Sequence, residues 1–208
     1  MPLFFQHSIN DYSKLAVWQI TETEDFFFRE ESVMPLINND HKRLQHLAGR
    51  YLLKLIEPSF PINKIEILQS KKPHLPGKEF HFSISHCRDF VAVIISTQLA
   101  GIDIELIDEK VNRIKNKFLS DDEMQLINGL NDADHLKLLT LFWSCKEAMF
   151  KWYGKGRVDF KKNLRIKNFH LQNGKGHVQA IFKKENEILL KIDFCFLNDL
   201  CVSWLLQE

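Results

Sequence analysis

The same order of elements is predicted twice along the chain, once in each half. The segment "DHKRLQHLAGRYLLKLI", residues 40–56, has leucines at helical spacing and ends before "EPSFP", where two prolines stop a helix. Strand, turn and strand follow in "FHFSISHCRDFVAVIIS". A helix over about residues 136–153, stopped by "GKG", again precedes strand, turn and strand in "LLKIDFCFLNDLCVSWLLQ". Placing "RDF" (88–90) over "NDL" (198–200) aligns the apolar strands that flank both turns.

This repetition predicts an α+β fold made of two similar subdomains, related by pseudo-twofold symmetry. The 208 residues divide into an N-terminal half at 1–100 and a C-terminal half at 101–208. Each half is large enough to hold a hydrophobic core. The seam between them is the expected place for a ligand.

Composition excludes several classes of protein. The net charge is +1 without a terminal run of like charge, so neither a nucleic-acid binder nor a polybasic membrane segment is indicated. The apolar runs are shorter than a membrane span needs, and "MPLFFQHSINDYSK" lacks the features of a signal peptide. We therefore expect a cytoplasmic protein without a membrane partner. Four scattered cysteines without a zinc-like spacing indicate reduced thiols: Cys87, Cys145, Cys195 and Cys201.

Two acids stand one residue apart in the apolar strand "GIDIEL", residues 101–106. Alternate strand residues share a face, so Asp103 and Glu105 point the same way and lie about 6.5 Å apart along the strand. Like charges so close repel unless water or a cation lies between them, and hard divalent cations prefer such oxygen ligands. A solvated strand face explains this stretch equally well.

The sequence of the predicted helix "LLTLFWSCKEAMFKWYGKG" favours a functional site. Glu147 lies nearly opposite its apolar stripe, flanked by Trp143 and Phe150, with Lys151 at i+4. Large aromatic residues beside the acid imply that this second face is also covered, which is typical of cleft residues. An exposed Glu–Lys pair beside incidental aromatics is the alternative. The stripe predicted to face the core comprises Leu138, Leu141, Phe142, Cys145, Ala148, Met149 and Trp152.

"GIDIE", followed some forty residues later by "WSCKEAMFKWYGKG", resembles the signature pair of the 4'-phosphopantetheinyl transferases. "RLQHLAGR", "KKPHL" and "FSISHC" occur in the order seen in the longer, pseudo-dimeric class that includes the surfactin-synthetase activator. The resemblance implies a monomeric holo-carrier synthase. Such an enzyme transfers the 4'-phosphopantetheine group of coenzyme A to a serine of an apo acyl or peptidyl carrier protein and releases adenosine 3',5'-bisphosphate.

By the resemblance, Asp103, Glu105 and Glu147 would hold Mg²⁺, with Mn²⁺ possible, and the metal would neutralise charge on the leaving phosphate. Glu147 is the implied base, directly or through a metal-bound water, and Lys151 would stabilise the transition state or the departing diphosphate. The matching positions for coenzyme A are Arg43, Arg50, Lys72, Pro73, Ser85 and His86. A solvated arginine or a structural histidine is the ordinary alternative at each cationic position.

Residues 109–119, "EKVNRIKNKFL", carry four basic side chains beside the apolar Val111, Ile114 and Phe118. Such a surface suits an acidic carrier protein, and a solvated basic loop explains it as well. Two other functions use the same residues. A metal-dependent hydrolase would cleave a nucleotide or diphosphate with water in place of serine. A binding module without activity would have no need of the complete set of acids and Lys151.

Overall fold

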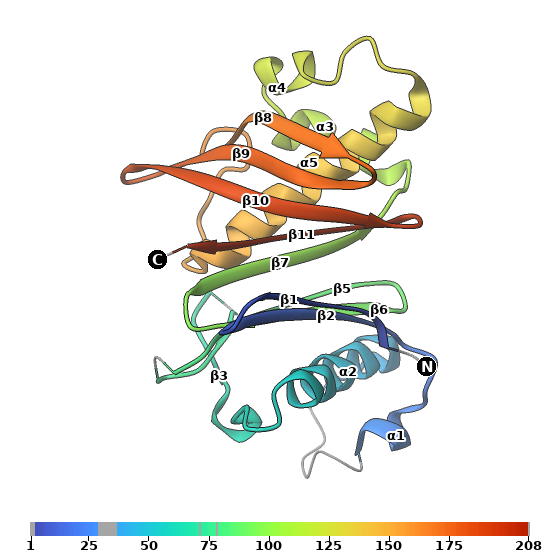
Figure 1. Cartoon of the computed structure of the whole chain (residues 1–208), viewed down its shortest axis with the longest axis vertical. Coiled ribbons are helices and arrows are strands. Elements are labelled where there is room, and N and C mark those ends of the chain that lie inside the picture. Colours follow the sequence, from blue (N-terminus) through green and yellow to red (C-terminus); the bar gives the residue numbers. More distant parts are fainter. Residues whose placement is uncertain (1–2, 29–36, 71, 78, 208) are drawn as a thin grey trace. The chain divides into compact units, whose positions relative to one another are not determined.

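The computed structural model describes residues 3–70, except 29–36, together with 72–77 and 79–207. It forms a mixed α+β fold, as predicted, and divides into two compact units, Met1–Ala100 and Gly101–Glu208. Each unit has a sheet with one long helix on it (Figure 1). The pseudo-twofold relation between the units, and a ligand at their seam, stay predictions.

The first unit is built on a four-stranded sheet in the order β1-β2-β6-β5. Its strands are β1 (Leu3–Asn10), β2 (Ser13–Gln19), β5 (His81–Cys87) and β6 (Phe90–Ser96). The long helix α2 (Asp40–Ile56) begins at the Asn39 cap and packs on β2 and β6 through its leucines. Shorter elements complete the unit: α1 (Glu24–Phe28), η1 (Ile62–Lys64), β3 (Glu66–Ile67) and β4 (Pro73–His74).

The second unit has a five-stranded sheet in the order β7-β11-β10-β9-β8. The strands are β7 (Leu99–Leu106), β8 (Leu164–Gln172), β9 (Lys175–Lys183), β10 (Glu187–Leu197) and β11 (Leu200–Gln207). Helix α5 (Asp132–Tyr153) crosses one face of this sheet, and α3 (Lys110–Phe118) packs on α5 (Figure 1). The short α4 (Asp121–Gln125) precedes α5.

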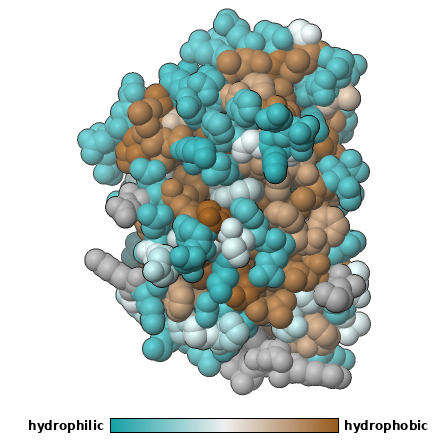
Figure 2. All heavy atoms as spheres, viewed as in Figure 1, coloured by the Kyte–Doolittle hydropathy of each residue, from teal (hydrophilic) through white to brown (hydrophobic). Residues whose placement is uncertain are grey.

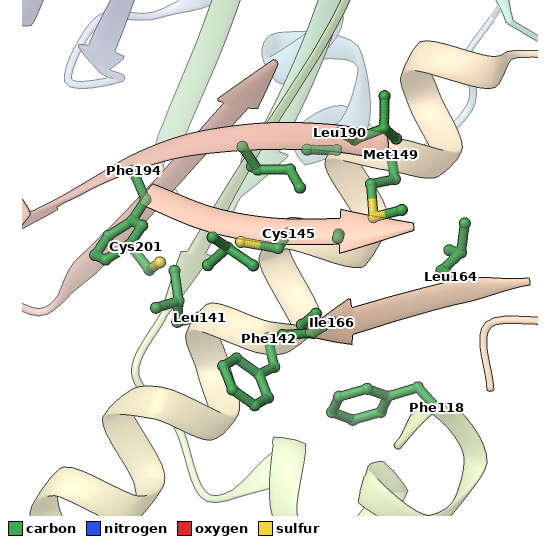
Figure 3. Close-up of a cluster of buried hydrophobic side chains, with 14 of the residues drawn as sticks. Phe118, Leu141, Phe142, Cys145, Met149, Leu164, Ile166, Leu190, Phe194 and Cys201 are labelled. Carbon is green, nitrogen blue, oxygen red and sulfur yellow. The ribbon is translucent and has the colours of Figure 1, made fainter. Parts of the chain in front are cut away.

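Helix α5 buries the predicted stripe. Leu141, Phe142, Cys145 and Met149 pack against strand residues such as Phe194 (Figure 3). All seven stripe residues are buried, so the prediction is confirmed. The other face of the helix is covered as well, because Trp143 and Phe150 lie partly buried against the ring of Phe160. Helix α5 is therefore buried on two sides, which an isolated surface ion pair would not require.

The two units share the helix and hairpin that the sequence predicts. In both, the second strand of the hairpin lies between the first and another strand, giving β2-β6-β5 in one unit and β7-β11-β10 in the other. The residue after that other strand donates its backbone N–H to the turn, Ile20 to Asp89 at 2.7 Å and Ile107 to Asp199 at 2.9 Å. Arg88 and Asn198 have the same left-handed backbone at φ of 49° and 54°. This agreement in detail is what a duplication produces.

Hydrophilic residues cover much of the face seen in Figure 2, with hydrophobic residues between them. No helix within the described ranges is long and apolar enough to cross a membrane. All four cysteines are free, and all but Cys87 are buried, which confirms the prediction of reduced thiols. Burial raises the pKa of the Cys145 thiol to about 12, so this group is inert.

Candidate functional site

Strand β7 presents its acids to helix α5. A Cβ atom added to Gly101 would lie 2.1 Å from the carbonyl oxygen of Ala148, so the helix backbone rests directly on this strand. Gly101, Asp103 and Glu105 alternate along β7 and therefore share the face that meets α5. A glycine is needed here because any side chain would separate the strand from the helix.

Two contacts connect this face of β7 to α5. The Lys151 ammonium lies 2.6 Å from Oδ1 of Asp103, which is buried. Two residues further along β7, Oε1 of Glu105 accepts a hydrogen bond from the Trp143 indole N–H at 2.8 Å. Residues 143, 147 and 151 follow one another at successive turns of the helix. Glu147 therefore lies between the two contacts, on the side of the helix that faces both acids.

The surroundings of Glu147 shift its protonation. Burial above all, together with the charges of Asp103 and Glu105 and against the opposing charge of Lys151, raises the pKa of its carboxyl to about 7. The charges of the other two acids thus act on Glu147. A carboxyl group with a pKa near 7 is suited to accept a proton at neutral pH.

The three carboxylates are not already assembled around a metal position. Among the described residues, no three His, Cys, Asp or Glu side chains form a group that could hold a metal ion. Lys151 and Trp143 instead bind oxygens of Asp103 and Glu105. The donor chemistry still fits a hard divalent cation, because buried, mutually repelling carboxylates are its preferred ligands. The metal assignment of Asp103, Glu105 and Glu147 stays a prediction.

In the first unit, two of the predicted phosphate-binding residues lie together. Arg50 on α2 donates Nη1 to Nδ1 of His46 at 3.0 Å. Burial, followed by the charges of Arg50 and His86, lowers the pKa of His46 to about 4. The exposed His86 on β5 is therefore close to this pair. Sequence reasoning missed His46, although its i, i+4 spacing with Arg50 on one helix was a signal.

Arg43, which was predicted to bind coenzyme A, contacts groups of the protein in this structure. Its guanidinium binds both oxygens of Glu24 on α1, at 3.0 and 2.9 Å, and also contacts Asp40 at 2.9 Å. A further N–H donates to the carbonyl oxygen of Ile37 at 2.8 Å. In this structure Arg43 thus joins α1 to α2. A phosphate group would have to replace carboxylates to reach it.

The remaining predicted coenzyme A residues lie on or next to strands of the first unit. Ser85 is buried on β5, opposite Ala92. Pro73 is the first residue of β4, which contacts β5. Lys72 directly precedes it, and burial lowers the pKa of its ammonium to about 8. A half-buried cation of this kind is a suitable partner for a phosphate, and its role in binding coenzyme A stays a prediction.

Residues 110–118 of the basic segment form helix α3, not a loop, and the choice between a carrier-binding surface and a solvated one stays open. Its apolar side has a structural use, because Val111 and Phe118 are buried in the core of the second unit. Arg113 and Lys117 are exposed. The apolar side of the helix is therefore anchored in the core, and basic side chains on the other side are exposed.

Comparison with known proteins shows which family the part of the chain that carries β7 and α5 resembles. Residues 100–199 match the family model of the 4'-phosphopantetheinyl transferase superfamily. This range, just under half of the chain, is similar to that superfamily. The resemblance predicted from the sequence is confirmed, and the matched range contains α5 and all of β7 except Leu99, with the site residues of both.

Three relatives are similar to parts of this chain, and two of them are named as 4'-phosphopantetheinyl transferases. The 4'-phosphopantetheinyl transferase gsp of Aneurinibacillus migulanus is 28% identical over 68% of this chain and 56% of its own length. The transferase psf-1 of Bacillus pumilus is 38% identical over 37% of this chain and 33% of its own. Enterobactin synthase component D of Salmonella typhimurium is 28% identical over 60% of this chain and 56% of its own. The matches thus span about half of these relatives or less.

Proposed function

We propose that the chain transfers the 4'-phosphopantetheine group of coenzyme A to a serine of an apo carrier protein. The observation that carries the proposal is the placement of Glu147 between the Asp103–Lys151 and Glu105–Trp143 contacts, inside a range that is similar to the transferase superfamily. This arrangement puts a base, a cation and two further carboxylates within one helix–strand contact.

In this reaction the serine oxygen forms a bond to the phosphorus that carries the pantetheine. The bond from that phosphorus to the bridging oxygen breaks, and adenosine 3',5'-bisphosphate leaves. Glu147 would accept the serine proton, directly or through a metal-bound water. Lys151 would stabilise the charge that develops on the phosphate oxygens.

Asp103, Glu105 and Glu147 are the residues that would hold Mg²⁺. The cation would neutralise charge on the diphosphate of coenzyme A when bound. In the first unit, Arg50, Lys72 and His86 supply the cationic groups that a multiply charged phosphate requires. Arg43 contributes to this set only if phosphate replaces Glu24 at its guanidinium.

Mass spectrometry of a panel of apo carrier proteins tests the proposal. Each carrier is incubated with the chain, coenzyme A and Mg²⁺, and we expect at least one to gain the mass of a phosphopantetheine group at a serine. Omission of the chain is the control. Turnover of coenzyme A or a nucleotide without any gain in carrier mass would support a hydrolase and contradict the proposal.

A further inference from the structure

The second unit contains a buried ion pair that the proposed reaction does not use. Lys146 precedes Glu147 on α5 and points in a different direction, because adjacent helix residues are about 100° apart. Its ammonium lies 2.8 Å from the carboxylate of Glu123 on α4. Both side chains are completely inaccessible to solvent. Charges are rarely buried in this way unless every polar atom has a partner.

The pair is fully satisfied by its neighbours. Besides Glu123, the Lys146 ammonium donates to the backbone carbonyl oxygens of Phe118 at 2.6 Å and Phe160 at 3.0 Å. The Glu123 carboxylate also accepts from the backbone N–H groups of Ser120 at 2.8 Å and Ile166 at 2.7 Å. The ammonium group has three N–H bonds, and each has an acceptor. This network therefore fixes the main chain of Phe118 and Phe160 against α5.

Phe118 and Phe160 are also the two residues that enclose Trp143. The Phe118 ring packs edge-on against Trp143 with ring centroids 5.1 Å apart. The Phe160 ring stacks on Trp143 at 5.6 Å. Trp143 in turn donates to Glu105 at 2.8 Å. A continuous series of contacts thus leads from a buried lysine to a carboxylate of the candidate site.

We propose that Lys146, with Glu123, is a positioning pair that sets the orientation of Glu105. It acts by holding the backbones of Phe118 and Phe160, whose rings hold the indole of Trp143. The inference rests on the proposed function for what Glu105 does. The claim that the pair orients Trp143 does not depend on that function. Stability alone does not explain the pair, because buried ion pairs are often replaced by apolar residues without loss.

The test is a double substitution, Lys146→Met with Glu123→Gln. Removing Lys146 alone would leave a buried unpaired carboxylate, whereas the double variant is neutral. Ser120 and Ile166 donate to different oxygens of Glu123, so the single glutamine oxygen can still accept from one of them. We expect a folded protein in which the half-activating Mg²⁺ concentration for transfer rises about tenfold, as for other partners of metal ligands. The KM for coenzyme A should stay within about twofold, because no coenzyme A residue is altered.

A second measurement needs no activity. In ¹H–¹⁵N spectra of the metal-free protein, the indole resonance missing from Trp143→Phe identifies Trp143 among the four tryptophans. We expect the double variant to shift this resonance and to speed its exchange with solvent. Ile192→Val, a buried change on β10, serves as a control of modest destabilisation that should leave the resonance in place.

Should the double variant not fold, Phe160→Leu tests the same connection, because it removes the stacked ring and keeps the carbonyl acceptor. A folded variant with an unmoved Trp143 resonance would overturn the proposal. A moved resonance in a chain that transfers nothing to any carrier would uphold the positioning of Trp143 and reject the proposed function instead.

Discussion

Gly101→Ala should separate β7 from α5. The added Cβ would lie 2.1 Å from the carbonyl oxygen of Ala148 and 2.8 Å from the backbone nitrogen of Trp152. Ordinary contacts begin at 3.4 Å, so the backbones must move apart by roughly 1 Å. Both atoms belong to helix backbone and cannot rotate away. Overpacking lowers the free energy of unfolding by about 1–3 kcal/mol, and we expect a clash with helix backbone to lie at the upper end of this range.

The same movement should impair the site. Helix α5 carries Glu147 and Lys151, and a displacement of about 1 Å can reduce turnover roughly 100-fold. Urea unfolding and the rate of carrier modification measure the two effects. Gly77→Ala is the matched control, because nothing lies within 4 Å of its Cβ position. Unchanged stability and turnover in Gly101→Ala would refute the close contact of β7 with α5.

Three further predictions concern other residues of the two units. The pKa of His46 is lowered to about 4 from an ordinary 6.5, so between these values the unfolded chain binds a proton that the folded one does not; urea unfolding at pH 7 and 5 should show a larger loss of stability in the parent than in His46→Gln, and equal losses would contradict the burial of this ring. Lys72→Ala should raise the KM for coenzyme A with kcat nearly kept, and a pure loss of kcat would reject a role in binding. Lys151→Ala should lower kcat and kcat/KM together, because its charge stabilises the transition state, and a change in KM alone would argue against that role.

The sequence predicted the parts of the fold whose signal is local. Helices α2 and α5 show their buried faces through 3.6-residue periodicity, although α5 begins at Asp132 and not near residue 136. The spacing of Ser120 and Glu123 is another local signal, and the two residues form a capping box at the start of α4. Strand alternation and helical spacing fix which side chains share a face within β7 and within α5, whereas the meeting of the two elements was implied only by the resemblance to the family.

Other parts depend on contacts between distant segments. The hairpins β1–β2 and β8–β9 were not predicted. Strand β1 exposes much of its length, and in β8 the alternation of Leu164 and Ile166 shifts at a register change between Ile166 and Asn168. From the sequence alone Lys146 would be taken for a solvated residue, because its partner Glu123 lies 23 positions away along the chain. Helix α3 was detectable from Val111, Ile114 and Phe118, whose spacing fits one helical face.

The most direct test compares the parent chain with Glu147→Gln, a change that keeps the shape of the side chain and removes its charge. Both are incubated with coenzyme A, Mg²⁺ and an apo carrier, and the carrier is weighed by mass spectrometry. We predict that the parent adds phosphopantetheine to the carrier serine and that the variant, folded to the same extent by circular dichroism, adds almost none. Equal modification by both proteins would contradict the central role of this carboxylate between β7 and α5.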